Sequence, residues 1–204
     1  MSSLLFPAPC GLPDSIPDAE VSYRSDFLSG SEADALLESL LELSDWRRER
    51  LRIFGRELDA PRLSAWYGDP GIAYSYSGVT HVALGWPEQL VGIHARLEAE
   101  LGVPFNGVLA NCYRSGADSM GWHSDDEREL GSRPVIASLS LGAQRRFRLR
   151  HRSRDDLETL DLPLAHGSLL VMAGDTQRHW RHSLPKTKRC HEPRVNLSFR
   201  RIRV

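Results

Sequence analysis

The sequence predicts an α+β domain in which helices support an antiparallel sheet or barrel. Two segments with helical spacing lie in the first half of the 204-residue chain, and short, partly alternating segments fill the second half. Helices first and a run of strands later are typical of this fold class. The length suits one domain with a core of its own and is too short for two domains of ordinary size.

The first helix is expected over residues 31–44, where Ser31 followed by Asp34 resembles a helix start. Its apolar side would come from five leucines, Leu36, Leu37, Leu40, Leu41 and Leu43. The second helix is expected to begin at Pro87, because proline fits the first turn of a helix. It should end at Gly102, a residue typical of helix ends.

The strands are separated by Gly, Pro, Asp or Ser. They are expected at residues 107–114, 134–141, 146–151, 168–173 and 194–202, with earlier candidates at 50–56, 62–67 and 72–76. Residues 1–20 are rich in Pro, Ser and Gly and are read as a loosely ordered lead-in. Residues 21–204 are read as the single domain.

The composition is that of an ordinary globular protein, with 41% hydrophobic and 26% charged residues. No stretch approaches eighteen apolar residues, so no membrane span is expected. The N-terminus shows neither the basic n-region nor the continuous apolar h-region of a secretory signal, so none is expected. The 3 cysteines are widely spaced and odd in number, which favours a reducing compartment over a disulfide framework. We therefore expect a monomer in the cytoplasm of a bacterium or the nucleus of a eukaryote.

The net charge of −1 conceals an uneven distribution. Residues 1–45 carry a net charge of −8, residues 46–144 carry −2, and residues 145–204 carry +9. Such a gradient predicts that one face meets a polyanion. Solvated surface arginines are the alternative.

The segment His123-Ser-Asp125 is a candidate metal site. In an extended segment, residues i and i+2 point to the same side about 6.6 Å apart along the backbone, so both side chains can reach one ion. A second imidazole from a distant strand would complete a facial triad, which leaves open positions for an oxygen-activating Fe(II) centre. His179 and His182 are both available, and spacing alone does not decide between them. A surface histidine beside an acidic run is the alternative interpretation.

The segment Arg194–Arg200 alternates strictly between polar and apolar residues. Arg194, Asn196, Ser198 and Arg200 would share one face of a strand, and Val195, Leu197 and Phe199 the other. Two guanidinium groups six residues apart suit a small dicarboxylate, because each guanidinium can donate two hydrogen bonds to one carboxylate. A polar face turned to water is the alternative.

Together these motifs closely resemble the AlkB family of Fe(II)- and 2-oxoglutarate-dependent dioxygenases over roughly residues 50–203. The shared elements are N-x-Y, H-x-D-x-E, a later H-S-L-P and a final R-x-N-x-x-x-R, in this order. The resemblance implies a double-stranded β-helix (jelly-roll) core over residues 105–204, buttressed by helices. It also implies that His182, which directly precedes the S-L-P turn, is the third iron ligand with His123 and Asp125. It assigns the 2-oxoglutarate site to Asn111, Tyr113, Arg194, Asn196 and Arg200.

On the substrate side, residues 50–80 resemble the nucleotide-recognition lid of the family's duplex-DNA repair branch. There Phe54 matches the residue that intercalates into the duplex, and Tyr76 matches the residue that stacks on the flipped base. Further substrate contacts are expected from Arg62, Tyr74, Glu127, Arg145, Lys186 and Lys188. Phe54 as a core residue, Tyr74 as a packing residue and Glu127 as a loop cap remain open alternatives.

The resulting hypothesis is oxidative demethylation of N-alkylated bases of the 1-methyladenine and 3-methylcytosine type in DNA. It requires Fe(II), 2-oxoglutarate and dioxygen, and it releases formaldehyde. One alternative keeps this chemistry but acts on RNA or protein. A second alternative is a non-catalytic nucleic-acid-binding domain on a jelly-roll scaffold, for which a complete metal triad would have no use.

Overall fold

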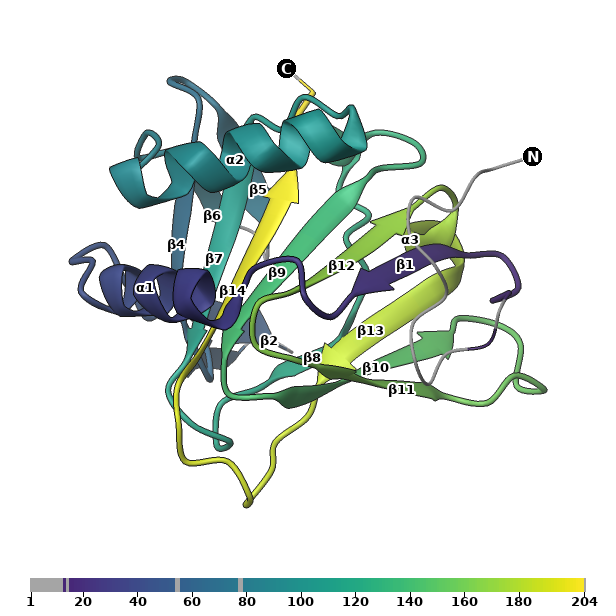
Figure 1. The fold of residues 1–204 in the computed structure, drawn as a ribbon. Helices are drawn as coiled ribbons and strands as arrows, with labels where there is room; N and C mark the ends of the chain where they lie inside the picture. The colour runs from purple at the N-terminus through teal and green to yellow at the C-terminus, as the bar shows by residue number, and fades with distance from the viewer. Residues whose placement is uncertain (1–12, 14, 54–55, 77–78, 204) are drawn as a thin grey trace.

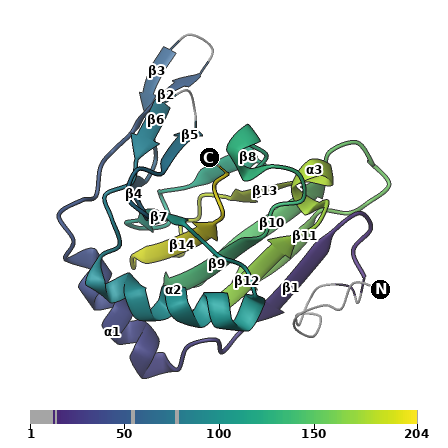
Figure 2. The ribbon, with the colours of Figure 1, turned by 90° about the horizontal axis from the view of Figure 1, so that it is seen from above.

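Two antiparallel sheets face each other, and two helices cover the outer face of the larger sheet (Figures 1 and 2). The computed structural model describes residues 13, 15–53, 56–76 and 79–203. The six-stranded sheet has the order β1 (Glu20–Arg24), β12 (Ser168–Ala173), β9 (Ile136–Gly142), β14 (Arg194–Arg200), β7 (Gly107–Tyr113) and β4 (Leu63–Gly68). The four-stranded sheet has the order β11 (Leu160–Leu164), β10 (Arg145–His151), β13 (Trp180–Leu184) and β8 (Met120–His123).

Two hairpins and two short helices complete the described part of the chain. The hairpins are β2 (Arg50–Ile53) with β3 (Arg56–Asp59) and β5 (Ala73–Tyr76) with β6 (Val79–Val82). Both extend away from the two facing sheets (Figure 2). The short helices are the 3₁₀ turn η1 (Arg128–Leu130) and α3 (Thr176–His179), the turn that leads directly into β13. No helix among the described residues is long and apolar enough to cross a membrane.

The helices α1 (Gly30–Leu41) and α2 (Glu88–Leu101) lie side by side on the larger sheet (Figure 2). Both predicted helices are confirmed, α1 ending three residues before the predicted 44. The end of α2 follows the prediction, because Gly102 takes a left-handed conformation (φ 63°) that favours glycine. Pro87 is the N-cap of α2, one position before its first turn.

The start of α1 differs from the prediction. Ser29, not Ser31, is the N-cap: its side chain accepts the backbone N–H of Glu32, and the Glu32 carboxylate accepts the backbone N–H of Ser29. This reciprocal arrangement is a capping box. The sequence contains two serines in this segment, and only one has a glutamate three residues after it.

The core has two layers, and β14 separates them. Between the helices and the larger sheet, Val195, Leu197 and Phe199 pack against leucines of both helices, including Leu40 and Leu97. The second layer fills the space between the two sheets. It includes Leu109, Ile136, Leu170 and Met172 of the larger sheet with Phe147, Leu149, Leu162 and Leu164 of the smaller one. The predicted alternation of β14 is therefore confirmed, and its polar face is turned into the space between the sheets instead of toward water.

All five strands predicted after residue 104 are present. Five strands lie outside the predicted ranges, namely β1, β6, β8, β11 and β13, and β3 shares only Arg56 with them. Of the five, β8, β11 and β13 span only 4 or 5 residues and contain Gly121, Pro163 or Arg181. The leucines of β11 do alternate, but proline and glycine argue against a strand interior, and runs this short are ambiguous. The edge strands β1 and β4 lie before residue 105, outside the range predicted for the jelly-roll core.

The capping box predicts unequal effects of two neighbouring serines on stability. Ser29→Ala should lower the free energy of unfolding by about 1 kcal/mol, because it leaves first-turn N–H groups of α1 without their acceptor. Ser31→Ala should change it by less than about 0.5 kcal/mol, as exposed substitutions usually do. Urea denaturation of both variants measures the difference. A larger loss in Ser31→Ala would contradict the position of the cap.

Candidate active site

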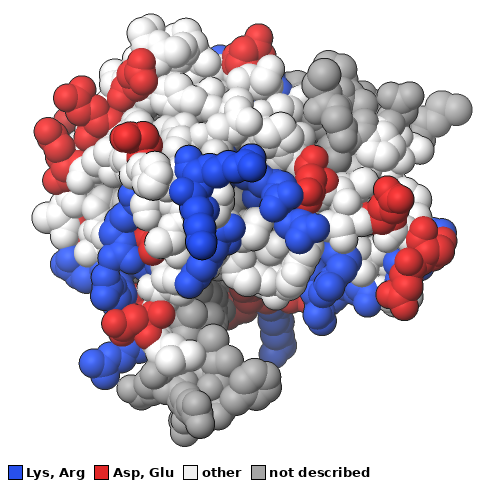
Figure 3. Space-filling view, turned by 90° about the horizontal axis from the view of Figure 1, so that it is seen from below, with Lys and Arg blue, Asp and Glu red and all other residues white. Residues whose placement is uncertain are grey.

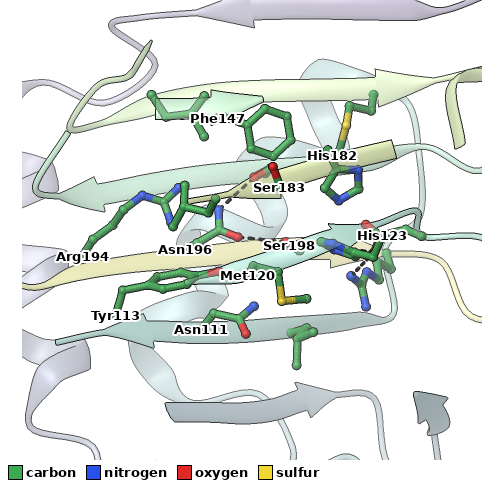
Figure 4. A pocket seen from close by; sticks show the side chains of 17 residues that line it. Asn111, Tyr113, Met120, His123, Phe147, His182, Ser183, Arg194, Asn196 and Ser198 are labelled. Atoms are coloured by element: carbon green, nitrogen blue, oxygen red, sulfur yellow. Dashed lines mark hydrogen bonds and ion pairs between the residues drawn. The ribbon is translucent and has the colours of Figure 1, made fainter. Parts of the chain in front are cut away.

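His123, Asp125 and His182 meet at one end of the space between the sheets (Figure 4). His123 is the last residue of β8 and pairs directly with His182 of β13, so both imidazoles leave the sheet on the same side. Their ring centroids lie 4.1 Å apart. One ligand atom from each of the three residues lies within 4.8 Å of the other two, a spacing that one metal ion can bridge.

The protonation states of the three residues suit a divalent cation. Burial lowers the pKa of His182 to about 3 and also lowers the pKa of His123, so both rings are neutral at physiological pH. Burial alone would raise the pKa of Asp125, but the charge and hydrogen bond of Arg200 together with the neighbouring histidines outweigh it and keep this pKa below its ordinary value. Two neutral imidazoles and one carboxylate anion are the ligand forms that a metal requires.

The ring nitrogens support the same conclusion. His123 Nδ1 lies 2.9 Å from the carbonyl oxygen of Gly121, to which the neutral ring donates its N–H. The lone pair on Nε2 is then available on the side of Asp125, whose Oδ1 is 3.9 Å away. His182 Nδ1 is buried and has no hydrogen-bond partner among the described residues. The donor set therefore fits Fe(II), the ion predicted for a triad of two histidines and one carboxylate.

The structure places His182, and not His179, with the other two ligands. His179 belongs to α3 and stacks on His151, with ring centroids 5.8 Å apart. His151 Nε2 lies 3.4 Å from Asp18, which makes a second group of potential ligands. However, His151 Nδ1 accepts the backbone N–H groups of Ser153 and Arg154, which leaves the ring proton on Nε2. A protonated nitrogen does not bind a metal, so this group is a pair between the buried His151 and the exposed Asp18.

A pocket lined by the polar face of β14 extends from the triad. Asn111 and Tyr113 of β7 line it opposite Asn196 and Arg194, with which they are paired across the sheet. The structure thus brings together all five residues predicted for 2-oxoglutarate, Asn111, Tyr113, Arg194, Asn196 and Arg200. The first four are labelled in Figure 4. The pocket is also lined by Ser138, Met120 and Phe147, which the sequence motifs did not indicate.

Arg194 supplies an uncompensated positive charge at the end of this pocket away from the triad. Its guanidinium donates to Ser140 Oγ at 2.9 Å, while Nε is buried without a partner. No acidic side chain among the described residues forms an ion pair with it, and burial lowers its pKa to about 10. Burying an unpaired charge is costly. The pocket is therefore suited to an anion that neutralises Arg194, such as the carboxylate of a 2-oxo acid.

Arg200 occupies the other end of the same strand face. Its Nη2 donates to Asp125 Oδ1 at 2.9 Å, and both side chains are 5% exposed. Burial alone would lower the pKa of Arg200, but Asp125 together with Tyr74 and Glu127 outweighs burial and raises it. Arg200 Nε and Nη1 are buried without partners, so this guanidinium can hold a second anionic group beside the metal position.

Three of the predicted substrate-contacting residues border the triad. Arg62 is buried and donates from Nε to Asn111 Oδ1 at 2.7 Å. Tyr74 is buried, with its ring stacked on Trp66 at 5.0 Å and the Arg200 guanidinium 5.1 Å from its centroid. Glu127 lies near the Tyr74 hydroxyl, and burial raises the pKa of its carboxyl. Tyr74 therefore packs against Trp66 and also lies close enough to the triad to contact a substrate. Phe54 and the side chain of Tyr76 lie outside the described residues.

Arg145 does not have the exposed position that phosphate contact requires. It is 2% exposed, and its guanidinium donates to the backbone carbonyls of Ser115, Asp118 and Pro185. A group with so little exposed surface cannot meet a phosphate, so the predicted direct contact is wrong. Instead, Arg145 holds two loops together. One of them carries Lys186 and Lys188, which are both exposed.

The family model described as the 2OG-Fe(II) oxygenase superfamily matches residues 20–200 of the chain. The chain is 40% identical to alpha-ketoglutarate-dependent dioxygenase alkB homolog 3 of Homo sapiens over 192 residues, 90% of this chain and 66% of the human protein. It is 43% identical to DNA oxidative demethylase ALKBH2 of Mus musculus over 181 residues, 84% of this chain and 76% of the mouse protein. The chain thus spans just under two thirds of the first relative.

Two solved structures show the same fold at low sequence identity. OsALKBH1 superimposes with a TM-score of 0.63 at 15% identity, covering 92% of this chain and 99% of that one. A prolyl hydroxylase from Trichoplax adhaerens superimposes with a TM-score of 0.61 at 12% identity, covering 89% and 83%. The predicted α+β fold, with its antiparallel sheets in a jelly-roll arrangement, is thereby confirmed.

The ligand assignment predicts different metal affinities for two histidine variants. His182→Ala should weaken Co(II) binding by more than the roughly 10–100-fold typical of losing an outer partner, because a direct ligand is removed. His179→Ala should leave the affinity unchanged, since its ring lies in the other cluster. Titration of the metal-free protein with Co(II), followed by visible absorption, measures both. Equal losses would contradict the choice of His182.

Proposed function

Since the chain belongs to the 2OG-Fe(II) oxygenase superfamily, and within it to the alkB homologue family, we propose that it demethylates N-alkylated bases in DNA. The substrates would be of the 1-methyladenine and 3-methylcytosine type, and the methyl group would leave as formaldehyde. One observation carries the proposal: a complete His–Asp–His triad shares one buried pocket with the unpaired guanidinium of Arg194.

The chain's own residues prepare this pocket for iron and 2-oxoglutarate. Bound together, these two groups supply the dioxygen activation that oxidises an N-methyl group. His123, Asp125 and His182 would hold the iron, and their neutral and anionic forms mean that no proton has to leave first. Arg194 would neutralise one carboxylate of 2-oxoglutarate, with Asn111, Tyr113 and Asn196 lining the same pocket. Asp125, His182, Arg194 and the other buried side chains of the pocket exclude bulk water from the reacting groups, while His123 is partly exposed.

A base inside a duplex cannot reach a buried metal position, so it must rotate out of the stack at a cost of a few kcal/mol. We assign this step to a lid over residues 50–80, which contains the hairpins β2–β3 and β5–β6. Tyr74 of β5 contacts Arg200, so this hairpin begins beside the metal pocket. Strands β2 and β3 are paired up to Ile53 and Arg56, on either side of the proposed intercalating residue Phe54.

The side chains beside the triad favour a positively charged base. Glu127 provides a carboxyl and Tyr74 an aromatic ring next to the metal position. N1-methyladenine and N3-methylcytosine carry a positive charge that undamaged bases lack. Anionic and aromatic groups attract such a cation, which would select these lesions over normal bases.

The loop between β13 and β14 provides a surface for the phosphate backbone. Lys and Arg side chains gather in the middle of the face seen from below (Figure 3), the side on which this loop protrudes in Figure 1. Lys186 and Lys188 line a shallow hollow there together with residues 115–117. Backbone hydrogen bonds of Gly116 to Thr187 and Cys190, both 2.8 Å, fix the loop in addition to Arg145. A basic loop that is already ordered loses little entropy on binding.

The proposed reaction predicts formaldehyde and succinate in equal amounts when the Fe(II)-loaded protein meets an oligonucleotide that contains 1-methyladenine. His182→Ala should abolish both products, because the iron is no longer held. Methylated duplex DNA, single-stranded DNA and RNA compared in the same assay separate the DNA proposal from its RNA alternative.

The proposed lid predicts a further difference between substrates. Phe54→Ala should slow repair of duplex DNA more than repair of single-stranded DNA, because only a duplex needs the intercalating residue. Turnover of RNA alone would contradict the DNA assignment, and equal losses in Phe54→Ala would remove the intercalating role.

The basic loop predicts a change in the salt dependence of binding. The double variant Lys186→Ala, Lys188→Ala should reduce the slope of log K against log salt concentration by roughly 0.9 for each duplex phosphate that the loop no longer neutralises, up to about 1.8. Arg24→Gln is the control, because Arg24 lies on β1 and is ion-paired with Glu100 at 3.0 Å. Fluorescence anisotropy over a salt series measures the slopes. An unchanged slope in the lysine variant would contradict phosphate binding by this loop.

A further inference from the structure

Two buried hydrogen bonds attach the loop that carries Asp125 to α3 and to the first residue of β13. The backbone N–H of Asp125 donates to Gln177 Oε1 at 2.9 Å. The hydroxyl of Ser124 donates to the carbonyl oxygen of Trp180, also at 2.9 Å. Gln177 is 2% exposed and Asp125 is 3% exposed, so water does not substitute for either group. The loop is therefore attached at its metal-binding residue to the segment 177–180.

This segment also leads to the third metal ligand. Gln177 lies in α3, the single turn that continues directly into β13, and His182 follows five residues later. The amide of Gln177 has a defined orientation, because Oε1 accepts the N–H of Asp125 and Nε2 faces Met172 Sδ at 3.5 Å. One short segment thus supplies a ligand and the support of another ligand.

The strand pairing itself does not fix Asp125. Strand β8 ends at His123, which the pairing with His182 fixes in register. Asp125 lies two residues beyond the end of the strand, outside the ladder that β8 forms with β13. The Arg200 guanidinium holds the Asp125 carboxylate, and the Gln177 amide accepts the Asp125 backbone N–H. The Ser124 hydroxyl, bonded to Trp180, fixes the preceding residue.

We propose that Gln177 is a positioning residue for the iron site, which holds the Asp125 backbone so that its carboxylate meets His123 and His182. The proposal rests on the iron site of the proposed function and is independent of the substrate. Residues that orient metal ligands from outside usually change metal affinity about 10–100-fold when they are replaced. Gln177 would orient Asp125 through its backbone N–H instead of through the side chain that binds the metal.

The test is Co(II) titration of the metal-free 204-residue chain, followed by visible absorption. Gln177→Met keeps the length of the side chain but removes the acceptor, and it should weaken Co(II) binding about 10–100-fold. Gln177→Glu retains an oxygen acceptor in either protonation state and should stay within about threefold of the wild type. Gln177→Asn, whose shorter side chain does not reach, should resemble Gln177→Met and serves if the methionine variant fails to fold.

Thr176→Val is the matched control, because Thr176 is the neighbouring buried residue of the same turn. Its hydroxyl accepts the backbone N–H of Glu20 at 2.9 Å and thus supports β1 instead of a metal ligand. This variant should lower the melting temperature without changing Co(II) affinity. Equal Co(II) affinities of Gln177→Met and Thr176→Val would overturn the positioning role. If the wild type itself bound no Co(II), or bound it independently of His182, the iron site of the proposed function would fail instead.

Discussion

Arg200 and Asp125 form a buried ion pair that connects the larger sheet to the metal-binding loop. The two groups lie 2.9 Å apart, and each side chain is 5% exposed. Removing one partner of such a pair leaves an uncompensated buried charge, which typically costs about 3–5 kcal/mol. The pair therefore keeps Asp125 anionic and in place before any metal binds. Arg200, at the end of β14, therefore has two roles: it holds Asp125 and it lines the 2-oxoglutarate pocket.

Strand β14 extends this constraint through the whole domain. Its apolar face packs Val195, Leu197 and Phe199 beneath the two helices, and its polar face presents Arg194 and Arg200 to the pocket. A shift of one residue in its register would bury two guanidiniums among the leucines of the helices. The same packing that stabilises the core thus fixes the distance between the two anion-binding ends of the site. This coupling explains how a short strand can carry both the core and the chemistry.

Features with a local signal were predictable from the sequence. The alternation of β14, the apolar spacing of both helices and the i, i+2 placement of His123 and Asp125 depend on neighbouring residues only. Long-range features were not predictable in this way. The choice between His179 and His182 follows from the pairing of β8 with β13. Spacing alone left it open, and only the resemblance to the AlkB family indicated His182. The burial of Arg145 depends on two loops that fold over β10, and the contact of Gln177 with Asp125 joins positions 52 apart in the chain.

The central claim is that the triad and the polar face of β14 form one site for iron and 2-oxoglutarate together. Anaerobic addition of 2-oxoglutarate to the Fe(II)-loaded protein tests it most directly, because chelation of Fe(II) by a 2-oxo acid produces a visible charge-transfer band. We expect the band to appear with both components, to be absent with either one alone, and to need a higher 2-oxoglutarate concentration in Arg194→Met. A protein that binds Fe(II) through the triad but gives no band with 2-oxoglutarate would contradict the claim.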